Sequence, residues 1–389
     1  MVTEPTSARP VGPGMIRGVS TATLPGPALE EFLTQPRPTP FLVLDPGIVA
    51  ARYAALRAAF PRAELLYAVK ACPEPAVLRL LAGLGCGFDV AGAEEIALCL
   101  AAGADPARLC HGNPVRGPGA AAAAAALGVT RFVTDSAEDR AGLPAGAEVL
   151  VRVLVTDEGS ATPFLGKFGA GPAEAVRLAC GAAGVAFHAG SQQVRPRTFA
   201  EAARTALRVA GAAGIRTPVL DAGGGLPVRY RADVPPLQEY AAALDAAVDA
   251  AVAAGDVDGV RLLLEPGRAL VAEAGVLRAG VLRVSRRPGI DHRRWVYLDV
   301  GRYQGLAETE NEAIDYPVRA PGRHGPPAPV VLAGPTCDGD DVLYRRRPYA
   351  LPADLAAGDV VDLLMAGAYT ASYAAVGFNG FPPLRVHVL

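Results

Sequence analysis

Short apolar runs alternate with alanine-rich helical stretches between about residues 60 and 270. The runs predict strands at 65–70, 87–90, 108–112, 131–135, 148–155, 185–190, 218–225 and 261–268. The stretches between them, such as AEEIALCLAAG and TFAEAARTALRVAGAAG, have the periodicity of helices. Strands that alternate with helices are typical of βαβ units and a parallel sheet. Eight such units predict a closed (β/α)8 barrel, and a doubly wound open sheet is the alternative fold.

The pattern changes after about residue 275, where apolar strands are joined by turns with little helix between them. These strands are GVLRAGVLRVSRR, RWVYLDVG, APVVLAGPTC and GDVVDLLM. The run TPFLVLD (39–45) also reads as a strand and is expected to pair with them. The pattern therefore predicts a barrel at 45–275, a joining strand at 31–44, and a C-terminal β-barrel or sandwich at 276–389.

Polar side chains are concentrated inside or at the C-terminal ends of the predicted barrel strands. They are Lys70, Asp89, His111, Asp135, Arg152, His188, Asp221 and Glu265. In a (β/α)8 barrel this end of the strands forms the active site, so these side chains are expected to meet on one rim. For any single one of them, the alternative is a residue that caps the next helix.

Lysine is almost absent from the chain. Of the 37 basic residues, two are lysines, Lys70 and Lys167, and the other 35 are arginines. An arginine guanidinium stays protonated, whereas a lysine amine can lose its proton and form a Schiff base. Lys70, at the end of the apolar run LLYAVK, is therefore a candidate catalytic residue, and the alternative is a lysine left at a strand end by chance.

The bulk composition excludes several classes of protein. A formal charge of -2 gives no basic surface for nucleic acid, and no apolar stretch is long enough to cross a bilayer. Residues 1–30 are rich in Pro, Gly, Ser and Thr and predict a flexible leader without the features of a signal peptide. The six cysteines show no CxxC pairing, so reduced thiols in a cytoplasmic protein are expected.

Three motifs supply the groups that pyridoxal 5′-phosphate requires. Lys70 offers an amine for the aldehyde, and the glycines of DAGGGLP (221–227) with Arg268 offer donors for a phosphate. Glu265 of EPGR offers a carboxylate that keeps the pyridine nitrogen protonated, so that the ring accepts electrons. Taken alone, the three glycines are also compatible with a tight turn between a strand and a helix.

These motifs occur in a longer ordered series that runs from about residue 38 onward. The series is YAVK (67–70), GFDVAGAEEI (87–96), NP (113–114), GKFG (166–169), HAGSQ (188–192), DAGGG (221–225), EPGR (265–268), GPTCDGDD (334–341), GAYT (367–370) and FNGF (378–381). With this series the chain resembles the fold-type III, pyridoxal-phosphate-dependent decarboxylases of basic amino acids, the ornithine, lysine and diaminopimelate group. It is most similar to the bacterial ornithine and lysine decarboxylases of that group.

The resemblance implies a role for each matched residue. Lys70 would carry the cofactor as a Schiff base, and Glu265 would pair with its pyridine nitrogen. His188 would stack on the ring, and Cys337 would protonate the carbanion left after CO2 departs. The residues implied around the phosphate are Ser191, Gly223, Gly224, Gly225, Arg268 and Tyr369. Those implied beside the Schiff base are Asp89 and Arg152.

The resemblance also implies a homodimer whose two active sites are shared between the subunits. The segment with Cys337 and Asp338 would come from the second subunit, and Asp338 would face the distal amine of the substrate. Lys167 would pair with Asp341 across the interface. No metal ion is expected.

A second substrate-binding acid is expected within GLAETENEAIDYPVRA (305–320). Asp315 is the first candidate, and its rivals are Glu308, Glu310 and Glu312. The implied substrate is L-ornithine or L-lysine, because a distal ammonium favours a carboxylate, whereas the distal carboxylate of diaminopimelate favours an arginine.

Several alternatives stay open. The substrate could be diaminopimelate, or a modified or carrier-bound amino acid of specialised metabolism. Other classes are an alanine-racemase-like enzyme and a non-catalytic, decarboxylase-like regulator. Cys72 stands where many relatives have asparagine, and a Pro/Gly-rich stretch at 321–329 follows the acidic segment. Both departures bear on the shape of the pocket.

Overall fold

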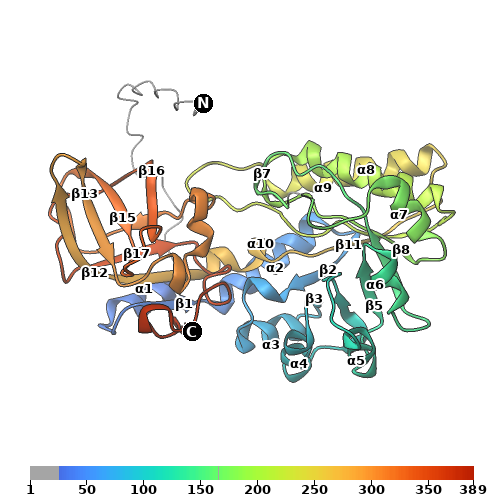
Figure 1. Ribbon diagram of the computed structural model, residues 1–389, viewed down its shortest axis with the longest axis horizontal. Helices are drawn as coiled ribbons and strands as arrows, with labels where there is room; N and C mark the ends of the chain where they lie inside the picture. Colours follow the sequence, from blue (N-terminus) through green and yellow to red (C-terminus); the bar gives the residue numbers. More distant parts are fainter. Residues whose placement is uncertain (1–25, 165) are drawn as a thin grey trace, which may run out of the picture.

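The computed structural model describes residues 26–164 and 166–389, so residues 1–25 of the predicted leader lie outside the described residues. The first described helix, α1, spans Pro27–Thr34. Figure 1 shows two bodies side by side, a barrel of strands and helices on the right and a β-rich body on the left. No helix in the described part of the chain combines the length and apolar character that crossing a bilayer requires.

Eight parallel strands close into a barrel, which confirms the predicted (β/α)8 fold and excludes the open sheet. The strands are β2 (Ala63–Ala68), β3 (Gly87–Val90), β4 (Leu109–His111), β5 (Arg131–Thr134), β6 (Glu148–Arg152), β8 (Gly184–Ala186), β10 (Val219–Asp221) and β11 (Arg261–Leu264). The strand expected at 148–155 ends at Arg152, because the Leu154 amide donates to Ala170 O at 2.8 Å instead of continuing the ladder.

Helices cover the outside of the barrel, and proline begins four of them. Pro46, Pro75, Pro172 and Pro196 stand in the first turn, where a missing N–H costs no helical hydrogen bond. The helices are α2 (Pro46–Ala59), α3 (Pro75–Gly83), α4 (Ala93–Ala101), α5 (Ala120–Ala126), α6 (Ala137–Ala141), α7 (Pro172–Ala179), α8 (Pro196–Ala212), α9 (Leu237–Ala253) and α10 (Arg268–Val271).

A layer of apolar side chains fills the barrel interior. Its members come from seven of the eight strands and are Leu66, Cys110, Val133, Leu150, Ala186, Val219 and Leu263. This part of the interior is therefore packed core. Space for a ligand lies above it, where the strands end and the loops begin.

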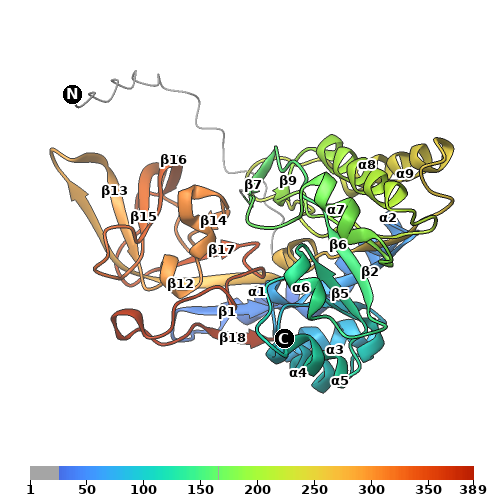
Figure 2. The same ribbon diagram turned by 45° about the vertical axis from the view of Figure 1, so that its right-hand side comes forward.

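The β-rich body is an eight-stranded sheet, as the second apolar pattern predicted. Its longest strand, β12 (Gly275–Arg287), continues directly from the barrel. The strand before the barrel, β1 (Phe41–Leu44), pairs antiparallel with β12 and parallel with β18 (Arg385–Val388), as Figure 2 shows. The other strands are β13 (Asp291–Leu298), β14 (Val318–Arg319), β15 (Pro327–Ala333), β16 (Val342–Pro352) and β17 (Val360–Leu364).

The loop that follows β17 joins the two bodies beside Lys70. The Tyr369 amide donates to Ala71 O at 2.7 Å, and Ser372 Oγ donates to Lys70 O at 2.7 Å. Lys70 itself lies in a short 3-10 turn, η1 (Val69–Ala71), directly after β2. The second body therefore contributes one wall of the rim on which the barrel strands end.

Candidate active site

Lys70, just after strand β2, forms an ion pair with Asp89 on the adjacent strand β3. Nζ lies 2.5 Å from Asp89 Oδ2, and the lysine side chain is 48% exposed whereas that of Asp89 is 4% exposed. Desolvation at the rim acts to lower the pKa of Lys70, but attraction by Asp89 and Glu265 outweighs it and raises that pKa above its ordinary value. The amine is therefore charged at neutral pH, and Asp89 is the nearest group that can accept its proton.

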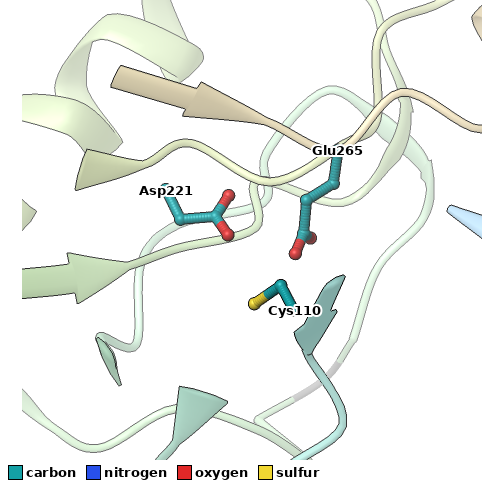
Figure 3. A group of neighbouring side chains, drawn as sticks. All are labelled: Cys110, Asp221 and Glu265. Carbon is teal, nitrogen blue, oxygen red and sulfur yellow. The ribbon is translucent and has the colours of Figure 1, made fainter. Parts of the chain in front are cut away.

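Glu265, which is half-buried, and Asp221, which is fully buried, form a pair of neighbouring acids, shown in Figure 3. Asp221 Oδ1 accepts the Gly223 amide at 2.9 Å, while Oδ2 is buried and has no donor among the described residues. Burial and then the charges of Asp221 and Asp89 raise the pKa of Glu265 well above its ordinary value, and burial raises the pKa of Asp221. The pair therefore keeps a proton that an exposed carboxyl would lose, and sharing it would satisfy Asp221 Oδ2.

Cys110 completes this group, since its sulfur and the two carboxylates offer atoms within 4.8 Å of one another. A thiol binds a metal ion as the thiolate. Burial, followed by the charges of Asp221 and Glu265, raises the pKa of Cys110 well above its ordinary value. The protonated thiol and the proton-sharing acids suit a cationic nitrogen heterocycle better than they suit a metal ion.

Asp221→Asn is expected to flatten the pH dependence of stability of the protein without cofactor. The ordinary pKa values of Asp221 and Glu265 are 3.8 and 4.5, and both are raised in the folded chain. Their destabilising contribution is absent below those values and grows as the pH rises through the raised ones. Between about pH 5 and about pH 8, the melting temperature should fall less in the variant, by about 2 °C or more. Calorimetry measures both slopes, and equal slopes would contradict the shared proton.

Arg268 is the centre of an anion-binding cluster at the start of α10. Its side chain is 4% exposed, and it donates to Tyr230 Oη at 2.9 Å, to Ser191 Oγ at 3.1 Å and to the carboxylate of Glu308 at 2.5 and 2.8 Å. Tyr369, with a positive φ of 64°, places its ring centroid 5.0 Å from the guanidinium. Arg268 and Ser191, two of the residues predicted to bind the phosphate, therefore lie in direct contact.

The glycine run 223–225 lies beside this cluster and must be glycine for steric reasons. Gly223 and Gly225 have φ of 65° and 90°, in the left-handed region. A Cβ on Gly225 would clash with Gly190 O, and one on Gly224 would lie 3.7 Å from His188 Nε2 and closer still to Glu265 O. The run therefore brings bare backbone against the segment that carries His188.

His188, beside the glycine run, and Arg152 line the next part of the rim. His188 Nδ1 accepts the Gly190 amide at 3.1 Å, and its ring meets that of Phe164 edge-on at 4.8 Å. Burial, Arg152 and Lys70 lower the pKa of His188 well below its ordinary value, so the imidazole is neutral. A cavity of about 80 Å³ is lined by Arg152, Phe164 and His188 among others. A larger one, about 250 Å³, lies against α8 and α9 and contains none of the predicted residues.

Two further polar residues at strand ends, His111 and Asp135, contact loops near the site. His111 is buried, and its Nδ1 lies 3.3 Å from Arg116 Nη1. Asp135 accepts the Gly169 amide at 2.8 Å and so fixes the loop that begins after Arg152. Both residues therefore contact loops around the site, and neither caps the helix that follows its strand, since those N-caps are Ser136 and Gly119.

The described residues fit the predicted cofactor on three counts. An amine stands at Lys70, the acids Glu265 and Asp221 offer a negative partner to a ring nitrogen, and bare backbone with Arg268 offers donors to a phosphate. The neutral His188 ring lies beside the glycines, where a flat ligand can stack on it.

Cys337 and Asp338 lie apart from this cluster. Both are exposed, and no hydrogen bond or ion pair in the described chain joins either of them to Lys70, Glu265 or Arg268. The Cys337 amide and thiol donate to Asn379 Oδ1 at 3.1 and 3.4 Å. The segment is held in shape at the surface, which is the arrangement that donation to a second subunit requires.

Asp341 stabilises the segment that carries Cys337 and Asp338 through buried hydrogen bonds. It is 2% exposed and accepts the Arg302 amide at 2.9 Å and the Thr336 hydroxyl at 2.7 Å. Lys167 lies elsewhere, with its ammonium 4.9 Å from the centroid of the Phe168 ring. The Lys167–Asp341 pair across an interface stays a prediction. The carboxylate of Asp341 already accepts hydrogen bonds within its own chain.

The four acids of the 305–320 segment have different surroundings. Asp315 binds the Tyr349 hydroxyl and lies 3.2 Å from Arg231. Glu312 accepts three backbone amides, those of Arg345, Arg346 and Arg347. Glu310 is 61% exposed, and Glu308, 11% exposed, is the acid that reaches Arg268. Of the four acids, Glu308 is therefore the one that contacts a residue predicted to bind the cofactor.

Sequence reasoning gave no role to Tyr230 or Cys110, and gave none to Asp221 beyond its place at a strand end. Tyr230 lies in an irregular loop between β10 and α9, where no periodic pattern marks it. Its contact with Arg268 joins residues 38 positions apart. The signal that could have found Asp221 is its place before the three glycines, where its carboxylate accepts the Gly223 amide.

Comparison with known proteins gives one family. The family described as "Pyridoxal-dependent decarboxylase, pyridoxal binding domain" matches residues 47–272. The chain is 35% identical over 357 residues to a lysine/ornithine decarboxylase of Selenomonas ruminantium, with 88% of each chain covered. It is also 36% identical over 369 residues to a diaminopimelate decarboxylase of Actinosynnema pretiosum subsp. auranticum, covering 87% of this chain and 82% of that one.

The fold is also similar to that of a relative whose structure has been solved. The lysine/ornithine decarboxylase of Vibrio vulnificus, complexed with cadaverine, superposes with a TM-score of 0.80 at 30% identity. The superposition covers 93% of this chain and 98% of that one, so it includes both the barrel and the β-rich body.

Proposed function

The chain belongs to the pyridoxal-dependent decarboxylase family, a group of enzymes that remove CO2 from amino acids with pyridoxal phosphate, and from this premise we propose that its substrate is L-ornithine or L-lysine. The products would be putrescine or cadaverine. Identity alone does not choose the substrate, because the chain is 35% identical to a lysine/ornithine decarboxylase and 36% identical to a diaminopimelate decarboxylase. The observation that carries the choice is the exposed carboxylate of Asp338 in the segment expected to meet the substrate. A second copy of this chain would complete each site with its Cys337–Asp338 segment.

The charges around the site support a substrate with a distal ammonium. Asp338 is an exposed carboxylate, and Glu308 is an acid inside the rim. Two arginines near these acids already have carboxylate partners, because Arg268 binds Glu308 and Arg231 binds Asp315. Neither of the two offers a free guanidinium to a distal carboxylate, such as that of diaminopimelate.

When bound, the cofactor would accept the electron pair that the departing CO2 leaves behind. Lys70 would hold it covalently through Nζ, with Asp89 ready to take the proton of the amine. Glu265, with Asp221 behind it, would hold the ring nitrogen, and the neutral His188 would cover one face of the ring. Cys337 of a second copy would return a proton to the α-carbon.

The test is CO2 release by the cofactor-loaded protein, offered L-ornithine, L-lysine, L-arginine, meso-diaminopimelate and the D-isomers at equal concentration. Preference for L-ornithine or L-lysine is expected. Preference for diaminopimelate would contradict the proposal and would favour the activity of the Actinosynnema relative. Release from none, with cofactor bound, would favour a modified or carrier-bound amino acid, and the segment 305–329 would then be the region to examine.

Asp338→Asn is expected to reduce kcat/KM for the preferred diamino acid by about 10²-fold, since an ammonium would lose its charged partner. Asp340→Asn is the matched control, because Asp340 is a neighbouring exposed acid with no proposed role. Steady-state kinetics of both variants give the comparison. Equal losses in the two would point to a disturbed loop, and no loss in either would remove Asp338 from the substrate site.

A further inference from the structure

The carboxylate of Glu308 occupies the donors expected to bind the cofactor phosphate. Oε1 lies 2.5 Å from Arg268 Nη2, and Oε2 lies 2.8 Å from Arg268 Nη1. Nη2 also donates to Ser191, which is one of the residues expected around the phosphate. A carboxylate and a phosphate both accept paired N–H bonds from the fork of a guanidinium, so the two acceptors suit the same donors.

The pair joins the two bodies of the molecule. Arg268 begins α10 of the barrel, and Glu308 lies in η5 (Ala307–Glu312), which follows β13 in the β-rich body. Both side chains are nearly enclosed, at 4% and 11% exposure. A buried guanidinium with a single charge cannot balance a carboxylate and a phosphate of nearly two charges together, so the two anions compete for it.

The backbone of η5 is anchored independently of Glu308. Glu312, at the end of the segment, accepts the amides of Arg345, Arg346 and Arg347 at 2.7–2.9 Å. The Thr309 hydroxyl donates to Leu306 O at 2.6 Å. Glu308 can therefore leave Arg268 by rotation of its own side chain while the rest of the segment stays in place.

We propose that Glu308 is a competitor of the cofactor phosphate, held on Arg268 until the phosphate displaces it. Once displaced, its carboxylate is left inside the rim without its cation, where a cationic group of a substrate can replace the guanidinium. Glu308 thereby couples cofactor loading to the charge of the pocket. This inference rests on the cofactor site of the proposed function, and its test uses no amino acid, so either can fail without the other.

The experiment measures binding of pyridoxal phosphate, inorganic phosphate and pyridoxal to the cofactor-free protein by calorimetry. Glu308→Gln should bind pyridoxal phosphate about tenfold more tightly than the wild type, and inorganic phosphate should also bind more tightly, because the charged competitor is gone. Pyridoxal, which lacks the phosphate, should bind equally well to both. Glu310→Gln is the matched control and should change none of the three affinities, since Glu310 is 61% exposed and lies 3.5 Å from Arg302.

Weaker binding of pyridoxal phosphate by Glu308→Gln would overturn the proposal, because Glu308 would then be orienting Arg268 for the phosphate. An unchanged affinity would overturn it as well. Glu308→Asp provides a second variant if the glutamine variant is poorly folded. The aspartate keeps the charge but is one methylene too short for the paired contact, so it should also tighten phosphate binding, by a smaller factor.

Discussion

Replacing Lys70 with arginine is expected to lower kcat by about 10³-fold or more, because the guanidinium cannot make the covalent link that an amine makes. The substitution keeps a cation for the buried Asp89, and the 48% exposure of the lysine side chain leaves room for the larger group. The fold should therefore survive. Mass spectrometry after borohydride reduction should find cofactor attached to the wild-type chain and none attached to the variant.

Mixing variants extends this result to the proposed shared site. A Lys70→Arg homodimer and a Cys337→Ala homodimer should each be nearly inactive. After subunits are exchanged at equal amounts, about a quarter of the wild-type activity should return, since half the dimers are mixed and each mixed dimer has one intact site. If no activity returned while mixed dimers were detected by mass, Cys337 and Lys70 would act within the same chain.

Glu265→Gln is expected to slow decarboxylation by about 10²-fold or more while cofactor binding changes much less. The amide has the shape of the carboxyl group and can donate to Asp221 Oδ2, which has no donor among the described residues. It carries no charge to hold a proton on the ring nitrogen, so electrons from the departing CO2 lose part of their acceptor. The ratio of kcat values separates this effect from a loss of bound cofactor.

Glu64→Gln is the control for this variant. Glu64 lies on β2, and its carboxylate is 3.3 Å from Arg108, far along the strand from Lys70. Its activity should stay within about twofold of the wild type, as is usual for an interaction near the surface. A kcat for Glu265→Gln close to that of Glu64→Gln would remove Glu265 from the chemistry.

The barrel and its rim were predictable because each strand carries its own local signal. A short apolar run with Lys70 or Glu265 just after it, or with Asp89 inside its end, marks both the strand and the end that faces the site. Strand β16 was not predicted, since it contains Arg345, Arg346 and Arg347 in succession and lacks an alternating pattern. The three arginines are exposed there, and their amides are bound by Glu312.

Contacts between distant segments could not be predicted from the sequence. Four acids stand within eight positions in 308–315, and local sequence does not distinguish them. Glu308 reaches Arg268, 40 positions earlier, only because β12 and β13 carry the chain out and back. The coupled protonation of Glu265 and Asp221 likewise depends on the closing of adjacent strands β10 and β11. The sequence motifs identified the individual residues, but they did not predict the Glu308–Arg268 ion pair or the raised pKa values of Glu265 and Asp221.

The pairing of β1 has a consequence for how the chain is made. In the finished protein, Phe41, Leu42, Val43 and Leu44 are fully buried between β12 and β18. Synthesis proceeds from the N-terminus, so β1 leaves the ribosome ahead of every barrel strand, yet neither of its partners is made until the barrel is complete. Throughout that interval an apolar strand has both edges unpaired, which makes it a site for chaperone binding or for association between nascent chains.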